Sequence, residues 1–300
     1  MKMSTTEARN ERTRDLDLMG TEEFLLVMNE EDQKVALAVR AAVPQIAQAV
    51  DAIRESLRAG GRLIYIGAGT SGRLGVLDAS ECPPTFGTDP SMVVGLIAGG
   101  PTALTSAIEG AEDDADAGAQ DLKDINLSAQ DAVVGIAASG RTPYVIGGLD
   151  YATQVGATTI SLACNPNAAV SEHAEIAIEV DNGPEVLTGS TRLKSGTSQK
   201  LVANMLSTAS MVGLGKVYGN LMVDVRPTNI KLVDRAIRIV QEATGCDRET
   251  AEVAFEKSGH RPKVAIVALL TDTDPAAAEA LLEANAGFVR AAVTSQEEAE

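Results

Sequence analysis

The sequence predicts an α/β protein: a three-layer αβα sandwich with a central parallel sheet, preceded by helices and followed by a small all-helical domain. Five short apolar runs are typical of buried strands. Helix-periodic stretches separate several of these runs, which favours right-handed βαβ units and a sheet covered on both faces. Beyond Arg226-Pro227 only helical periodicity remains. The 300 residues therefore divide into an N-terminal helical segment (1–60), an α/β domain (61–225) and a C-terminal helical domain (226–300).

The N-terminal segment is predicted to be helical. Thr21 precedes two glutamates, whose charges suit the first turn of a helix. Apolar residues then recur at steps of three and four between Val35 and Leu57. We expect a kink or a break at Pro44, because proline removes a backbone donor and clashes with the preceding turn. Gly60 is expected to end this helical stretch.

The strands are predicted from apolar runs too short for helices. Two helical stretches, Ala103–Asp124 and Pro143–Gln154, lie between them, and a further helix is expected to begin near Ser195. The predicted strands are Leu63–Ile66, Met92–Ile97, Asp131–Ala137, Thr158–Ala163 and Ala174–Val180.

Start and stop signals predict four helices in the C-terminal domain. An apolar stripe begins at Ile230 and ends at Gly245. Asp247 is placed to cap a second helix, and Pro262 suits the first turn of a third. Asp274 followed by proline is typical of the cap and first residue of a fourth.

Composition excludes several classes of partner. The formal net charge of −17 repels nucleic-acid phosphates and anionic lipid, so we expect neither partner. No apolar run approaches the roughly 20 residues that span a bilayer. The N-terminus has no apolar signal-peptide core, and the three cysteines are widely spaced, so we expect a cytoplasmic protein with reduced thiols. With two histidines far apart in the sequence, a histidine-rich metal site is not expected. No cofactor is expected.

Two loops, each at the end of a predicted strand, have a similar sequence. Residues 67–73 and 137–142 both combine small residues and hydroxyl side chains with a Gly-Arg pair. Thr70 and Ser71 follow the first strand where a helix should begin, with free backbone N–H groups and a positive dipole end. Such groups suit a small phosphate monoester. In a single loop these residues are more often turn and cap residues, but the repetition favours one phosphate site built from both loops. The candidate binding residues are Gly69, Thr70, Ser71, Ser139, Gly140 and Thr142.

The first loop also matches the dinucleotide-binding fingerprint formally, at Gly67, Gly69 and Gly72. That fingerprint needs an acidic residue at the end of the next strand, which here ends in alanine and two glycines. No Gly-Lys-Ser/Thr follows, so a P-loop is excluded as well. Dinucleotide binding is therefore disfavoured.

Two carboxylates are candidates for acid–base chemistry. Glu81 precedes Pro83-Pro84, which we expect to form a rigid loop just beyond a short helix and so to fix its position. Glu112 lies among other acidic residues, and by composition alone it is a solvated charge on a helix face. These residues predict a phosphoester site without specifying a reaction.

The Gly-rich segment Gly183–Thr197 opens the helix expected near Ser195. It is an ordinary loop with a helix cap, or it forms the rim of the site. Neither histidine is a candidate site residue. A histidine in the position of His173, just before a predicted strand, is more often a capping or core-edge residue than a catalytic one, and His260 is far in sequence from the candidate site. In the second interpretation of the segment, the rim residues are Glu185, Ser190 and Lys194.

These loops resemble those of the sugar isomerase domain family, in which strands that end in Gly-Thr-Ser and Ser-Gly-x-Thr bind sugar phosphates. Two longer stretches, Tyr65–Gly87 and Gly183–Thr208, are similar more narrowly to the N-acetylmuramic acid 6-phosphate etherases. Thr6–Asn10 and the helical C-terminal part are similar too, so the resemblance covers nearly the whole chain. One departure is Glu11, where many relatives carry proline.

The resemblance implies cleavage of the D-lactyl ether of N-acetylmuramic acid 6-phosphate to N-acetylglucosamine 6-phosphate and D-lactate, in cell-wall sugar recycling. The implied mechanism is elimination followed by addition of water, with Glu81 protonating the departing lactate. Glu112 is the second implied catalytic carboxylate, and the resemblance is the only reason to choose it. A homodimer is implied as well. Two alternatives stay open: an aldose–ketose phosphosugar isomerase and a non-catalytic sugar-phosphate sensor.

Overall fold

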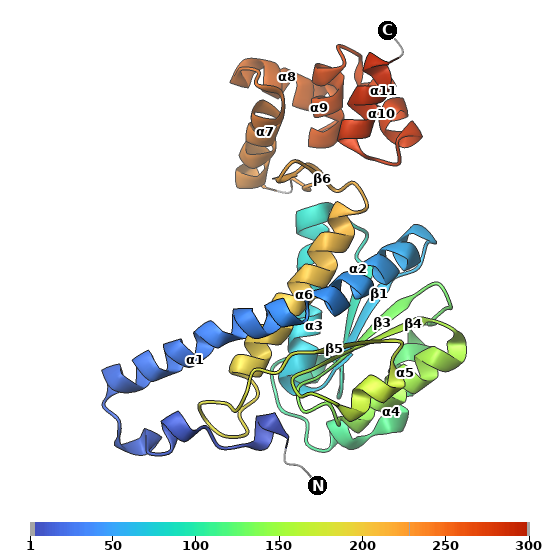
Figure 1. Cartoon of the computed structure of the whole chain (residues 1–300). Coiled ribbons are helices and arrows are strands. Elements are labelled where there is room, and N and C mark those ends of the chain that lie inside the picture. The colour runs from blue at the N-terminus through green and yellow to red at the C-terminus, as the bar shows by residue number, and fades with distance from the viewer. Residues whose placement is uncertain (1–3, 228, 299–300) are drawn as a thin grey trace. The chain divides into compact units, whose positions relative to one another are not determined.

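The computed structural model describes residues 4–227 and 229–298. The chain divides into two compact units. The first contains Met1–Ser80 and Ser91–Ser207, and the second contains Glu81–Pro90 and Thr208–Glu300. The first unit is the predicted α/β sandwich, and the second is built mainly from helices (Figure 1).

A five-stranded parallel sheet forms the centre of the first unit, in the order β2-β1-β3-β4-β5. Each of the five predicted apolar runs coincides with one strand, and β1 extends one residue beyond its run to Gly67, which confirms the predicted sheet. The chain places β2 on one side of β1 and β3 on the other, so the direction of winding reverses between β1 and β3. The strands are β1 Leu63–Gly67, β2 Val93–Ile97, β3 Ala132–Ala137, β4 Thr158–Ala163 and β5 Ile176–Glu179.

Helices cover both faces of this sheet, as predicted. On one face α4 (Ala115–Asp124) and α5 (Pro143–Val155) pack over Ile64 and Ile66 of β1. On the other face α3 (Gly69–Phe86) packs against Tyr65, and a Cβ added at Gly75 would lie 2.7 Å from the Cβ of that tyrosine. Glycine therefore allows α3 to approach the strand closely.

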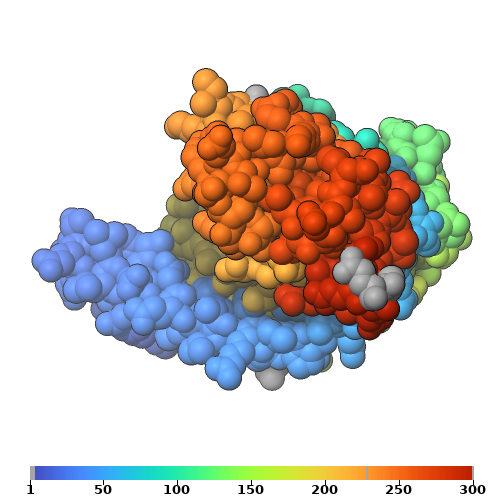
Figure 2. Space-filling view, turned by 90° about the horizontal axis from the view of Figure 1, so that it is seen from above, coloured from blue at the N-terminus to red at the C-terminus, as the bar shows by residue number. Residues whose placement is uncertain are grey.

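The break predicted at Pro44 is confirmed. Helix α1 (Thr21–Ala41) ends before it, and α2 (Val43–Arg58) takes the proline into its first turn, where a missing N–H leaves no carbonyl unpaired. Helix α2 contacts β1, β3, β4 and β5. The N-terminal part of α1 stands out from its unit (Figure 2). Three short 3-10 turns precede it: Thr5–Glu7, Glu11–Thr13 and Leu16–Leu18.

The long helix predicted over Ala103–Asp124 is wrong in its first half. Only α4 is α-helical, and two 3-10 turns, Pro101–Leu104 and Ala111–Asp113, precede it. Gly110 adopts a left-handed φ of 75°, which a continuous helix excludes. Asp114 then accepts a hydrogen bond from the N–H of Ala117 and starts α4 there.

The prediction of a rigid proline loop after Ser80 is also wrong, because α3 continues to Phe86. Pro83 and Pro84 lie in its last turn, although they lack the N–H groups that a helix uses to bond the carbonyls of Ala79 and Ser80. The helix ends at Gly87, whose φ is 63° and whose N–H donates to the carbonyl of Pro83. Glu81 is therefore a helical residue.

The second unit contains the four predicted C-terminal helices and a fifth that the sequence analysis did not predict. The predicted caps are confirmed: Asp247 accepts from the N–H of Thr250, and Asp274 from those of Ala276 and Ala277. A short hairpin, β6 (Val217–Tyr218) with β7 (Leu221–Met222), was not predicted. The helices are α7 Ile230–Thr244, α8 Arg248–Lys257, α9 Pro262–Leu270, α10 Pro275–Ala284 and α11 Val289–Glu297. Helix α6 (Lys194–Val212) begins in the first unit and continues into the second.

Candidate functional site

The two hydroxyl-rich loops leave neighbouring strands at the same edge of the sheet. Gly67, at the end of β1, pairs in register with Ile136, one residue before the end of β3. The reversal of winding falls between these two strands, and open α/β sheets bind ligands at such a switch point. The topology therefore brings together the two loops that the sequence singled out.

The first loop is a tight turn from β1 into α3. A Cβ at Gly72 would lie 2.6 Å from the carbonyl oxygen of Gly67, so only glycine fits this approach. The hydroxyl of Ser71, 6% exposed, donates to Oε1 of Gln199 on α6 at 3.0 Å. Thr70 is half-buried beside it at the N-terminus of the helix. The positive end of the α3 dipole suits an anion there.

The second loop is held by residues that follow β4. Gly140 has a φ of 71°, and a Cβ there would lie 2.4 Å from the Cβ of Ala168. Asn165 donates from Nδ2 to the carbonyl oxygens of Ala138 (3.2 Å) and Ser139 (3.3 Å). Thr142 ends the loop as the residue before α5. The backbone of this loop is therefore positioned by side chains distant in sequence.

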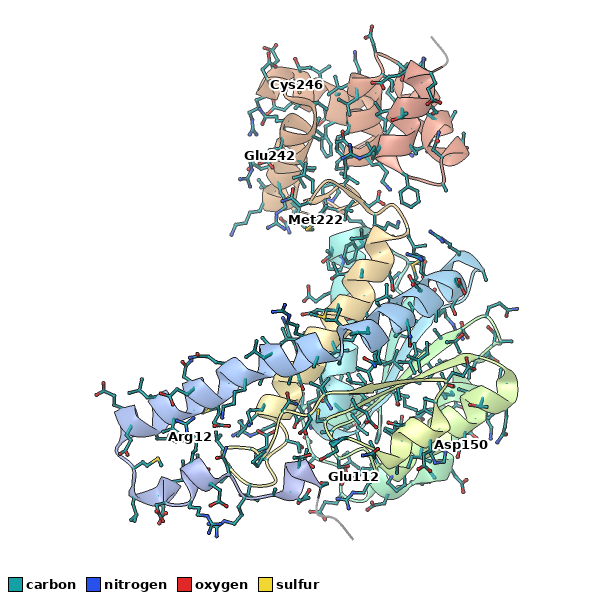
Figure 3. All side chains as sticks on the ribbon, viewed as in Figure 1. Arg12, Glu112, Asp150, Met222, Glu242 and Cys246 are labelled. Carbon is teal, nitrogen blue, oxygen red and sulfur yellow. The ribbon has the colours of Figure 1, made fainter. Side chains whose placement is uncertain are left out.

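Arg73 connects the first loop to the segment that carries Glu112. Its guanidinium donates to the carbonyl oxygens of Ala103 (2.8 Å) and Leu104 (3.0 Å). Glu112 follows on the turn Ala111–Asp113 with an exposed side chain (Figure 3). Arg73 thus anchors the chain between β2 and this carboxylate.

Glu81 lies on α3 about three helical turns beyond Thr70, with an exposed side chain. It belongs to the second compact unit, whereas Glu112 belongs to the first. That the two carboxylates serve one reaction stays a prediction.

Glu185 and Lys194 are both 1% exposed and have internal partners. Glu185 accepts from the N–H groups of Lys194 and Ser195, at 2.9 Å each, and so caps α6. The ammonium of Lys194 donates to Glu31 (2.9 Å) and to the carbonyl oxygen of Asn182 (2.8 Å). Ser190 is half-buried in the same segment. Direct contact of these three residues with a substrate stays a prediction.

Glu31, on α1, is a buried carboxylate that three cationic side chains contact. Burial acts to raise its pKa, but hydrogen bonds from Lys34 and Lys194 outweigh burial and lower the pKa from 4.5 to about 2. Arg12 also donates to this carboxylate (3.1 Å). The Glu31 carboxylate therefore connects α1 to the N-terminal segment and to the start of α6.

Sequence reasoning missed Asn165, Gln199 and Glu31. Asn165 had one detectable signal, because it comes two residues after the end of a parallel strand, where ligand-binding residues gather. Gln199 lies within Gly183–Thr208, which carries the resemblance, but neither Gln199 nor Glu31 has a signal in the sequence for its partner.

Cys164 is buried beside the first turn of α6, where its thiol donates to the carbonyl oxygen of Ser195. Burial raises the pKa of the Cys164 thiol to about 11, which keeps it protonated. Within residues 4–227 and 229–298, no group of three His, Cys, Asp or Glu side chains could hold a metal ion. None of the helices in these ranges has the length and apolar character of a membrane span.

The fold and the paired loops define a sugar isomerase (SIS) domain. Residues 114–209 match the SIS domain family model, and residues 45–153 match that of the N-terminal SIS domain of glucokinase regulatory protein. Residues 219–266 match the C-terminal lid domain of the same protein. A phosphoheptose isomerase from Francisella tularensis has the same fold, with a TM-score of 0.53 at 18% identity over 65% of this chain and 100% of that one.

Curated relatives identify the family. The chain is 63% identical to N-acetylmuramic acid 6-phosphate etherase 2 of Lactiplantibacillus plantarum, over 96% of this chain and 98% of the relative. It is 59% identical to N-acetylmuramic acid 6-phosphate etherase 2 of Vibrio cholerae, over 98% of this chain and 95% of the relative. The chain belongs to the N-acetylmuramic acid 6-phosphate etherase family, as the sequence motifs predicted.

Proposed function

We propose that this protein cleaves the D-lactyl ether of N-acetylmuramic acid 6-phosphate to N-acetylglucosamine 6-phosphate and D-lactate, in the recycling of cell-wall amino sugars. The observation that carries this proposal is 63% identity to a curated etherase along 98% of its length. Two phosphate-type loops at the switch point of the sheet support it.

The phosphate is proposed to bind between the two loops. Gly69, Thr70 and Ser71 offer a helix N-terminus with its backbone N–H groups, Thr70 adds a hydroxyl, and the bond from the Ser71 hydroxyl to Gln199 holds the loop against α6. The second loop adds hydroxyls and backbone N–H groups. Its proposed binding residues are Ser139, Gly140 and Thr142.

The proposed reaction is an elimination and then an addition. In the open-chain sugar the aldehyde acidifies the proton on carbon 2. This proton passes to a base such as water, and the electron pair it leaves forms the double bond from carbon 2 to carbon 3 and expels the lactyl oxygen from carbon 3. Glu81 is the proposed acid that protonates this oxygen, because an ether oxygen leaves poorly as an anion. Water then adds a hydroxyl to carbon 3 and a proton to carbon 2, with Glu112 as the proposed base toward the water.

The segment 183–194 completes the proposed site. Ser190 is the proposed direct contact, because it is half-buried at the segment's turn. Glu185 and Lys194 are buried and hydrogen-bonded within the protein. We propose that they support substrate binding indirectly, by holding the segment against α6 and α1.

The test is enzymatic detection of D-lactate after N-acetylmuramic acid 6-phosphate is added to the wild type, Glu81→Gln and Glu112→Gln. We expect lactate from the wild type and a loss of about 10²–10⁴-fold in Glu81→Gln, the usual contribution of a positioned acid. Sugar isomerisation without lactate would indicate an isomerase. A folded wild type that binds the phosphosugar without turnover would indicate a sensor.

We also propose a cytoplasmic homodimer. The support for the dimer is a set of exposed leucines on α1, where Leu25, Leu26 and Leu37 are 55%, 58% and 66% exposed. Light scattering on Leu26→Glu would show monomers if a second copy covers this face, and an unchanged mass would exclude it. The support for the cytoplasm is that the cysteines are few and widely spaced, as is usual in a reducing compartment.

A further inference from the structure

Residues 4–13, here called the N-terminal strap, are tied to the end of β4. Thr6 is 1% exposed, and its N–H donates to Oδ1 of Asn165 at 3.1 Å. Nδ2 of Asn165 donates in return to the Thr6 hydroxyl at 2.9 Å, and the Thr5 hydroxyl donates to Oδ1 at 2.9 Å. Asn165 is 3% exposed, so these bonds form away from water, where losing one leaves a buried polar group unpaired.

The same amide also reaches the second loop. Its Nδ2 atom carries two hydrogens, which are shared among the Thr6 hydroxyl and the carbonyl oxygens of Ala138 and Ser139. One side chain therefore connects the strap to the loop. The loop has little freedom to adapt, because Gly140 lies in the left-handed region against Ala168.

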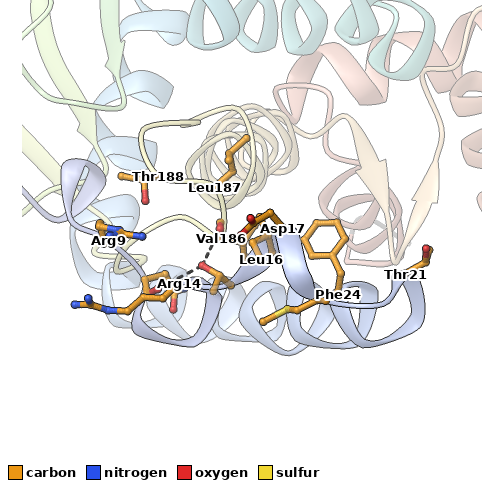
Figure 4. A pocket seen from close by; sticks show the side chains of 12 residues that line it. Arg9, Arg14, Leu16, Asp17, Thr21, Phe24, Val186, Leu187 and Thr188 are labelled. Atoms are coloured by element: carbon orange, nitrogen blue, oxygen red, sulfur yellow. Dashed lines mark hydrogen bonds between the residues drawn. The ribbon is translucent and has the colours of Figure 1, made fainter.

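The other end of the strap reaches the segment 183–194. Thr13 donates from its hydroxyl to the carbonyl oxygen of Val186 at 2.8 Å (Figure 4). Asn10 donates from Nδ2 to the carbonyl oxygen of Pro184 at 3.4 Å. Arg12 adds its bond to the buried Glu31.

A pocket of about 800 Å³ lies where the strap meets the second loop. Its walls include Ser4, Thr5 and Glu7 of the strap. Ser139 and Arg141 of the second loop line it as well. The strap is thus part of the wall of a cavity that opens on a proposed phosphate-binding residue.

We propose that the strap is a working part of the substrate site, and that Thr6 and Asn165 are positioning residues for the second phosphate loop. Through Asn165 the strap sets where the carbonyl groups of Ala138 and Ser139 point, and with them the hydroxyls and N–H groups that face the phosphate. The inference rests on the proposed function for the identity of the ligand. A merely structural strap would contribute to the stability of the fold and leave phosphosugar affinity unchanged.

The test compares Asn165→Asp, Thr6→Val and Thr6→Ser. Asn165→Asp keeps the size but turns the donor toward Ala138 and Ser139 into an acceptor, and Thr6→Val removes only the hydroxyl. The probe is N-acetylglucosamine 6-phosphate, measured by calorimetry, with KM and kcat for lactate release and Tm alongside. We expect about tenfold weaker binding in Asn165→Asp, a smaller loss in Thr6→Val and wild-type affinity in Thr6→Ser.

The matched control is Asn285→Asp in the second unit. Asn285 likewise donates from Nδ2 to a carbonyl oxygen, that of Leu281, and to the hydroxyl of Ser295. This variant should lower Tm without changing affinity. The same pattern in Asn165→Asp, a lower Tm with unchanged affinity and KM, would overturn the positioning role.

The two proposals fail in different ways. If the wild type binds the phosphosugar but releases no lactate, the etherase proposal fails and the affinities still decide the role of the strap. If the folded wild type binds no sugar phosphate, the proposed site and the strap's role in it are both overturned.

Discussion

The two phosphate-type loops look alike in sequence but are supported in different ways. The first is held mainly by its own geometry, since Gly67 and Gly72 pack together and α3 begins at once. The second depends on Asn165 and, through it, on Thr6, about 160 residues earlier in the chain. Loops of similar sequence therefore differ in their sensitivity to mutation. A substitution far away in the sequence should leave the first loop unchanged but can displace the second.

The largest expected effect is that of Glu31→Gln, which removes the charge shared by the strap and the segment 183–194. The pKa of Glu31 is lowered from 4.5 to about 2, so its ionised form stabilises the fold by about 3 kcal/mol at neutral pH. Because the folded pKa is depressed, this stability is present above about pH 4.5 and is lost as the pH falls toward 2. Urea unfolding of both proteins from pH 7 to pH 3 measures the difference.

The difference in free energy of unfolding should be constant from pH 7 to pH 5 and shrink below that. A constant difference down to pH 3 would show that the Glu31 charge does not stabilise the fold.

The next largest effect is the difference between Gly140→Ala and Gly69→Ala in the free energy of unfolding. Both glycines have positive φ, which costs an L residue about 1 kcal/mol. Only the second-loop variant also forces its Cβ to 2.4 Å from Ala168, whereas nothing lies within 4 Å at Gly69. We expect about 2 kcal/mol or more for Gly140→Ala and about 1 kcal/mol for Gly69→Ala in denaturant unfolding. Equal losses would remove this difference between the loops.

Gln199→Leu probes the side-chain bond that joins the first loop to α6. The Ser71 hydroxyl loses its acceptor on α6, and we expect about tenfold weaker binding of N-acetylglucosamine 6-phosphate by calorimetry. Gln120→Leu, on the exposed side of α4, is the control and should bind as the wild type does. Unchanged affinity in Gln199→Leu would mean that backbone geometry alone supports this loop.

The smallest effect is expected for Arg73→Met, which removes the two bonds to the carbonyls of Ala103 and Leu104. With the segment before Glu112 loosened, kcat should fall about fivefold while affinity for the sugar phosphate stays. Added to Glu112→Gln, the change should have no further effect, because it acts through that carboxylate. Additive losses, or weaker binding, would instead place Arg73 on the substrate.

Much of the fold was predictable because it follows local periodicity and chain breakers. The five strands, the break at Pro44 and the caps at Asp247 and Asp274 are confirmed. Two local predictions were wrong: Gly110 interrupts the helix expected over Ala103–Asp124, and α3 continues through its two prolines. The first depends on where a helix begins and the second on where a helix ends, and neighbouring packing decides both as much as propensity does.

The sequence by itself determined the α/β class, the family and the two hydroxyl-rich loops, because strand periodicity and contiguous motifs are local properties. Only the tertiary structure decided which residues hold those loops. Asn165 meets Thr6 and Ser139, and Lys194 meets Glu31, 163 residues away, through contacts that no local pattern encodes. Such pairs form because burial of a polar or charged group requires a partner, and the fold, rather than the sequence neighbourhood, supplies it.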